Sequence, residues 1–230
     1  IKAIVESRET PGFENTIVSL DISGRTLARV KGVFYALTEA DTNDEMSALS
    51  EKIAPVLSEH NDNIYLNQDL YKRVAAVWQQ DQECKITLTT EQHRLLDKYY
   101  KAFIRSGAGL DAGKQNRLRE INKELSTLAI TFSNHVLNEN NAYRLVIDNE
   151  AELAGLPEWV KTGAAEEAKA VGKEGKWLFT LQNSSRLPLL QYADNRELRK
   201  DIYEAYINRG NNGDANDNKE ILKKIISLRL

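Results

Sequence analysis

The feature that most constrains the fold is a long, unbroken helical pattern over Asp111–Asn141. Apolar residues recur along it in steps of three and four, at Leu118, Ile121, Leu125, Leu128 and Phe132. This spacing puts the apolar side chains on one stripe, which is stable in water only when it packs against another element. Because the stripe is too short for an extended coiled coil, the pattern predicts a helical hairpin or a multi-helix bundle.

Helical patterns cover most of the remaining chain, in which four prolines and 12 glycines leave few interruptions. Capping boxes are predicted at Thr42–Glu45, at Thr89 with Gln92, and at Asp194 with Glu197. The further helices expected cover 1–9, 10–37, 42–60 with a kink at Pro55, 64–80, 91–106, 150–155, 157–171, 194–206 and 218–230, with a turn at 61–63 and Pro188 closing a segment.

The second of these helices carries a glycine within its apolar stripe. Ile17, Leu20, Gly24, Leu27, Val30, Phe34 and Leu37 follow helical spacing. A glycine in the middle of a helix costs roughly 1 kcal/mol relative to alanine. We therefore expect the stripe to be buried and a neighbouring helix to approach closely at Gly24.

A change of period predicts the only strands. Residues 143–148 and 177–181 are short runs of β-branched and aromatic residues bounded by turn residues. We expect them to pair as a two-stranded ribbon that packs on helices, since an isolated ribbon is marginally stable. The predicted fold class is therefore mainly α, a multi-helix bundle of hairpins with one small β ribbon.

Composition excludes several classes of function. The chain is 41% hydrophobic and 28% charged, which is typical of a globular protein, and its net charge of −3 gives no electrostatic case for nucleic acid or an anionic membrane. Its apolar runs are too short to span a bilayer. A single cysteine, Cys84, excludes an intrachain disulfide framework.

The candidate catalytic residues are weak. None of His60, His93 and His135 lies in the H-E-x-x-H helical zinc motif. His135 and Glu139 share a helix face, but zinc needs three or four ligands and no third is evident, so a packed or surface polar pair is the favoured interpretation. Cys84 has no motif around it that would lower its pKa.

Two other groups of residues invite a functional interpretation. The polar stretch Thr180–Ser185 lacks the G-x-S-x-G turn of a serine nucleophile, so it is interpreted as a strand end and a helix cap. Trp78, Trp159 and Trp177 are each interpreted as core anchors. Taken alone, these residues indicate a helical globular domain and little more.

The order of segments along nearly the whole chain is more specific than any one of them. They are Phe13–Ile17, Leu20, Ser23-Gly24, Leu27, Arg29 and Val30; Thr42-Asn43, Ala54-Pro55, His60, Ile64 and Leu66-Asn67; Leu125-Ser126, Leu128, Phe132 and Leu137; Pro188, Gln191–Ala193, Arg196, Leu198-Arg199, Tyr203, Tyr206 and Arg209; and Asn216–Asn218, Ile221 and Leu228-Arg229. This order resembles the N-terminal region of bacterial peptidyl-dipeptidases, in the thimet-oligopeptidase family of zinc metallopeptidases.

The resemblance implies a mostly helical fold in which two halves flank a deep channel, with zinc bound by an H-E-x-x-H motif downstream of this chain. We therefore expect no catalytic, cofactor-binding or metal-binding residue here, and zinc only in the full-length protein. The expected division is a helical wall domain over 1–210, with a ribbon insertion at 143–181, and the start of a truncated catalytic body over 211–230. This part alone should be inactive.

The implied partners are short unfolded peptides, which the full-length enzyme shortens by C-terminal dipeptides or cleaves as an oligopeptidase. The implied compartment is the cytoplasm, or the periplasm if an export signal was removed. Since the chain lacks an initial Met and Leu230 lies within a helical pattern, we expect a part of a longer protein. Truncation would then expose an apolar face and favour self-association.

Two alternatives stay open. The first is a stand-alone helical domain that binds another protein and has no enzymatic activity. The second is a self-contained hydrolase that uses His135 or Cys84.

Overall fold

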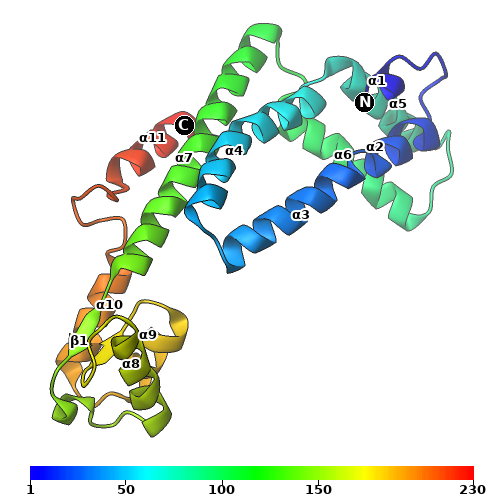
Figure 1. The fold of residues 1–230 in the computed structure, drawn as a ribbon. Helices are drawn as coiled ribbons and strands as arrows, with labels where there is room; N and C mark the ends of the chain where they lie inside the picture. Colours follow the sequence, from blue (N-terminus) through cyan, green and yellow to red (C-terminus); the bar gives the residue numbers. More distant parts are fainter. The chain divides into compact units, whose positions relative to one another are not determined.

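The computed structural model describes all 230 residues and divides them into two compact units, residues 1–130 and 131–230. The chain is mainly helical, with one small two-stranded sheet, which confirms the predicted fold class (Figure 1). The long helix α7, Ala112–Ala142, confirms the pattern that most constrained the fold. None of the helices is both long and apolar enough to cross a membrane.

Unit 1 consists of helices with one apolar core. Its elements are α1 Lys2–Val5, the π-helical turn η1 Phe13–Val18, α2 Ser19–Ile22, α3 Arg25–Ala40, α4 Asp44–Tyr65, α5 Gln68–Gln82, α6 Thr90–Arg105 and the first part of α7. The core lies where α5 and α6 pack against each other and against η1. Its fully buried side chains include Ile17, Leu70, Val74, Leu96 and Phe103.

Capping explains where several of these helices begin. Thr89 and Gln92 form the predicted capping box of α6, with both reciprocal hydrogen bonds present. Asn43 caps α4 by accepting a hydrogen bond from the backbone N–H of Met46, so Asn43 rather than Thr42 is the capping residue. At the other end of α6, Gly107 has φ 91°, as expected of a glycine that ends a helix.

Three predictions in unit 1 are wrong. The chain starts with a single short helical turn, α1, and not with a helix to residue 9. Gly24 does not lie inside a helix: its φ is 71°, it separates α2 from α3, and no atom lies within 4 Å of the position of an added Cβ. The predicted turn at 61–63 is helical, because α4 continues to Tyr65 and Asn67 caps α5 instead.

The apolar stripe of α3 is not buried, which is a further correction. No residue of α3 is buried, and Leu27, Val30, Val33 and Leu37 are all exposed. The partly covered residues of α3 are Phe34, Tyr35 and Thr38, and the rings of Phe34 and Tyr35 contact each other edge to face. The pattern therefore predicted the helix correctly, but no element of this chain covers its apolar side.

Unit 2 contains the ribbon. Its elements after α7 are β1 Leu145–Ile147, the 3-10 turn η2 Glu150–Leu153, α8 Glu158–Ala170, β2 Trp177–Phe179, α9 Asn183–Tyr192, α10 Arg196–Ile207 and α11 Lys219–Arg229. The strands are antiparallel, with Leu145 opposite Phe179 and Ile147 opposite Trp177, which confirms the predicted pairing. β2 packs on α8, so the ribbon gains the helical support that it needs (Figure 1).

The core of unit 2 joins the ribbon to α8, α9 and α10. Its buried residues include Ile147, Leu153, Phe179, Leu189 and Ile202.

Two local predictions in unit 2 need correction. The cap of α10 is Asn195, which accepts from the backbone N–H groups of Glu197 and Leu198, and not Asp194. Pro188 lies inside α9 and does not end a segment.

The two units meet at residue 130, within α7. The prediction of a wall domain over 1–210 and a catalytic body from 211 concerns the intact protein and stays a prediction.

Candidate functional site

The pair of residues considered as metal ligands holds a loop in place. The imidazole Nδ1 of His135 donates to Oδ1 of Asn218 at 2.9 Å. Oε2 of Glu139 accepts from the backbone N–H of Gly210 and from Nδ2 of Asn212, both at 2.8 Å. These bonds fix the segment between α10 and α11 on α7, which agrees with the interpretation of His135 and Glu139 as a packed polar pair.

Zinc does not fit this pair. Oε1 of Glu139 is buried without a hydrogen-bond partner, so one oxygen is available. A zinc ion requires three or four ligands, however, and the structure brings together no group of three or more His, Cys, Asp and Glu side chains that could hold a metal. We therefore derive no metal-dependent step from the residues of this chain.

The loop after Gly210 is ordered by its own acidic residues. Asp217 accepts hydrogen bonds from both the side chain and the backbone of Lys219, and these lower the pKa of Asp217 to about 2. The backbone N–H of Gly213 also donates to Asp217, at 2.7 Å. A carboxylate occupied in this way is a structural group and not a free acid or base.

The other candidate catalytic residues, His93, Cys84 and His60, do not bond to one another. His93 pairs through Nδ1 with Oδ2 of the buried Asp81, at 2.7 Å, and so links α6 to α5. Cys84 is an exposed free thiol with a φ of 54°, at the turn that follows α5. His60 is exposed on α4. None of these contacts joins a nucleophile to a base, as the catalytic pair of a hydrolase requires.

The tryptophans differ from one another. Trp78 stacks on Tyr100 with ring centroids 4.2 Å apart, and Trp177 packs against the core of unit 2, as predicted. Trp159 is 62% exposed, so its assignment as a core anchor is wrong. An exposed tryptophan is uncommon enough to indicate a contact surface.

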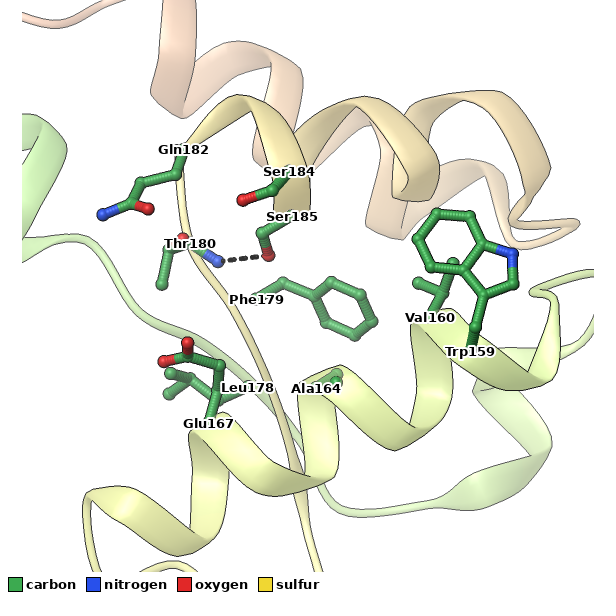
Figure 2. A pocket seen from close by; sticks show the side chains of 11 residues that line it. Trp159, Val160, Ala164, Glu167, Leu178, Phe179, Thr180, Gln182, Ser184 and Ser185 are labelled. Carbon is green, nitrogen blue, oxygen red and sulfur yellow. Dashed lines mark hydrogen bonds between the residues drawn. The ribbon is translucent and has the colours of Figure 1, made fainter.

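Trp159 lines a cavity of unit 2. The cavity lies between α8 and the start of α9 and has a volume of about 180 Å³ (Figure 2). Its lining residues are Trp159, Val160, Gly163, Ala164, Glu167, Leu178, Phe179, Thr180, Gln182, Ser184 and Ser185. The polar stretch 180–185 therefore forms one wall of a cavity, in addition to ending a strand and starting a helix.

One hydrogen bond shapes that wall. Oγ of Ser185 accepts from the backbone N–H of Thr180 at 3.0 Å, which folds the chain back from β2 into α9 (Figure 2). Behind it, the buried Arg186 is bonded to Oδ1 of Asn183, and its guanidinium lies 3.6 Å from the centre of the Tyr206 ring. These contacts make the wall a rigid part of unit 2.

Unit 1 has a polar groove between α4 and α7. It is lined by Glu59, Asp62, Asn63, Arg119, Glu120 and Lys123 and has a volume of about 330 Å³. Nδ2 of Asn122 donates to Asp62 at 2.8 Å, and Arg119 donates to Asn63. Burial raises the pKa of Asp62 from its ordinary value, against the lowering effects of Asn122 and Arg119.

No sequence pattern predicted the cavity of unit 2 or the groove of unit 1. The groove of unit 1 is lined by two segments far apart in the chain, 59–63 and 119–123, whereas the cavity of unit 2 is lined by residues 159–185, and no motif joins the lining residues of either. For the cavity of unit 2, the sequence contained one indication: Trp159 and Gly163 lie four residues apart, on one face of a predicted helix. The interpretation of Trp159 as a core anchor hid that indication.

Comparison with known proteins gives the class of the chain. It is 36% identical over 229 residues to the dipeptidyl carboxypeptidase of Escherichia coli strain K12, and this alignment covers 100% of the chain and 33% of that relative. It is 31% identical over 233 residues to the oligopeptidase A of Salmonella typhimurium, again over 100% of the chain and 34% of the relative. No protein-family model matches the chain.

The matches extend to a more distant relative. The saccharolysin of Saccharomyces cerevisiae is 25% identical over 223 residues, which cover 96% of the chain and 30% of that protein. The chain thus spans about a third of the length of the curated peptidases that it matches. These matches confirm the resemblance to the N-terminal region of peptidases of the thimet-oligopeptidase family.

Proposed function

We propose that the chain is the N-terminal part of a zinc metallopeptidase that removes C-terminal dipeptides from short unfolded peptides, or cleaves such peptides as an oligopeptidase. The observation that carries this proposal is the alignment of the whole chain with relatives named dipeptidyl carboxypeptidase and oligopeptidase A. Zinc would be held by residues of the intact protein outside this chain, since the residues here do not fit it.

The proposed role of this part is to confine the substrate. Helical walls exclude folded proteins from an active site and admit short extended peptides. The uncovered apolar side of α3 supports this role, because an amphipathic helix with no buried residue is a surface that another part of the intact protein or its substrate covers. We also propose a cytoplasmic location for the intact enzyme, with the periplasm as the alternative.

The experiment compares the 230-residue chain with the intact protein. Bound zinc is measured by mass spectrometry, and hydrolysis is followed with a short quenched fluorogenic peptide and by identification of the products. We expect stoichiometric zinc and hydrolysis, with dipeptide products, for the intact protein, and neither for the chain. An intact protein without zinc or peptidase activity would exclude the proposal.

The exposed side of α3 also agrees with the second candidate, a helical protein-interaction domain without activity. The same experiment separates the two, because a pure interaction domain predicts no hydrolysis at any length of protein. Activity of the chain itself that resists chelators and is lost in His135→Ala or Cys84→Ala would instead indicate the self-contained hydrolase.

A further inference from the structure

We propose that the cavity between α8 and the start of α9 binds a lysine or arginine side chain of a peptide. The proposal rests on the proposed peptidase function for the presence of peptides, and it names a side-chain class that nothing in that function specifies. It follows from the size, the lining and the charge of the cavity.

The cavity has an apolar floor. Leu178 and Phe179 of β2, with Val160 and Ala164 of α8, are buried and line it from below. Gly163 leaves the helix surface open beside them, since no atom lies within 4 Å of the position of an added Cβ. The volume of about 180 Å³ is below the ~300–1,000 Å³ of sites for small-molecule ligands. The cavity therefore suits one long side chain and not a whole cofactor.

The charge of the lining selects the kind of side chain. Glu167 is the only lining residue with a formal charge, and no lysine, arginine or histidine lines the cavity. The other polar groups are the hydroxyls of Thr180, Ser184 and Ser185 and the amide of Gln182, which are neutral and can donate or accept hydrogen bonds. The exposed carboxylate of Glu167 therefore decides the charge preference, and it favours a cation over an anion.

The shape of the cavity determines where the two ends of a bound lysine or arginine side chain would lie. Trp159 stands at one end of the α8 wall and Glu167 at the other, with Phe179 between them (Figure 2). Eight residues of helix separate the two along α8, or about 12 Å. The aliphatic stem of lysine or arginine can lie over the exposed Gly163, beside the indole of Trp159, with its charged head toward Glu167.

The test is a titration of the 230-residue chain with short peptides, both ends of which are blocked so that only the side chain differs. The probes are Ala-Arg-Ala, Ala-Gln-Ala and Ala-Glu-Ala. Binding is followed by tryptophan fluorescence, to which the exposed Trp159 contributes, and by calorimetry. We expect the arginine peptide to bind at least fivefold more tightly than the glutamine peptide, and the glutamate peptide most weakly. The preference should diminish as salt is raised.

Three variants assign the binding to the cavity. Gly163→Leu fills it from an open helical position and should weaken binding of the arginine peptide at least tenfold, with an unchanged circular dichroism spectrum. Glu167→Gln should weaken the arginine peptide by about two- to fivefold, the range for an exposed ion pair, and leave the glutamine peptide unchanged. Glu166→Gln is the matched control, because Glu166 is an exposed neighbour that does not line the cavity.

Equal binding of the arginine and glutamine peptides would overturn the proposal, and so would wild-type binding by a folded Gly163→Leu variant. This result is separable from the proposed function, which depends on zinc and hydrolysis in the intact protein. An active intact enzyme whose N-terminal part shows no arginine preference would refute the cavity assignment alone. Arginine-selective binding without hydrolysis would refute the enzyme alone.

Discussion

Unit 1 contains two buried carboxylates, Asp62 and Asp81. Asp62 accepts a hydrogen bond from Asn122, and Asp81 pairs with His93. In each case one neighbouring side chain compensates a group that is unfavourable to bury. Their substitutions should therefore have effects much larger than those of exposed residues.

Replacing Asp62 with asparagine should alter the pH dependence of stability. Burial raises the pKa of Asp62 in the folded chain above its unfolded value of about 3.9, so the folded state binds the proton more tightly. The contribution of Asp62 to stability is therefore greatest at low pH and is lost as pH rises through the folded pKa. Asp62→Asn keeps an acceptor for Asn122 and should be more stable relative to wild type at pH 7 than at pH 3.

Urea unfolding of both proteins at the two pH values measures this difference. Asp41→Asn, at an exposed aspartate after α3, is the control and should change stability to a similar small extent at both. A relative stability of Asp62→Asn that does not rise with pH would contradict the assignment of burial as the dominant cause.

Removing His93 should destabilise unit 1. The Asp81 side chain is only 4% exposed, and its Oδ1 already has no hydrogen-bond partner. His93→Ala removes the 2.7 Å contact from Oδ2 and leaves it only the 3.5 Å hydrogen bond from Nε2 of Gln82. Leaving a buried acceptor poorly satisfied costs roughly 1–3 kcal/mol. His60→Ala, at an exposed site on α4, should stay within about 0.5 kcal/mol of wild type in the same chemical denaturation measurement. Equal effects of the two substitutions would show that the Asp81–His93 contact contributes nothing.

At the scale of elements, α3 shows how one glycine can divide a continuous apolar pattern between a buried and an exposed helix. The steps of three and four from Ile17 to Leu37 are continuous in sequence, but Gly24 adopts a left-handed conformation and ends α2. Before it, Ile17 and Leu20 of the pattern enter the core of unit 1, while after it Leu27, Val30 and Leu37 remain exposed. The periodicity identified the helices, and a single backbone angle separated their environments.

Two glycines on either side of the start of α3 give a matched test. Gly24 has a φ of 71°, whereas Gly32 is helical, and neither has an atom within 4 Å of an added Cβ. Gly24→Ala should destabilise the chain by about 1 kcal/mol, because left-handed backbone disfavours a Cβ. Gly32→Ala should instead stabilise it by about 0.5–1 kcal/mol, through helix propensity. Thermal or urea unfolding checks both, and effects of the same sign would contradict the placement of Gly24 at a break.

At the scale of the whole molecule, the uncovered side of α3 predicts association of the chain with itself. Val30 is 60% exposed and Leu37 is 53% exposed, on the same side of the helix. We expect concentration-dependent association in sedimentation experiments, reduced by the double substitution of Val30→Ser and Leu37→Ser. The same change at Ala28 and Ala36, on the other side of α3, should leave it unaffected. A chain that stays monomeric at high concentration would contradict this prediction.

The helices and strands were more predictable than the cavity of unit 2 and the groove of unit 1, for a physical reason. Helical period, capping chemistry and β-branched runs act over a few residues, so α6, α7 and the pairing of β1 with β2 followed from the sequence. The turn expected at 61–63 failed because Asn61–Asn63 resembles a turn locally, while Asp62 is held within α4 by Asn122, 60 residues away. No local pattern contains that contact.

The sequence by itself determined the helical class, the ribbon, the absence of an H-E-x-x-H motif and the resemblance to a peptidase family, because each depends on residue order along a short stretch or along the whole chain. Only the tertiary structure decided that Trp159 is exposed over a cavity, that His135 and Glu139 hold a loop, and that α3 has no buried residue. Those features depend on which distant segments come into contact, and burial, cavity shape and hydrogen-bond partners exist only once they do.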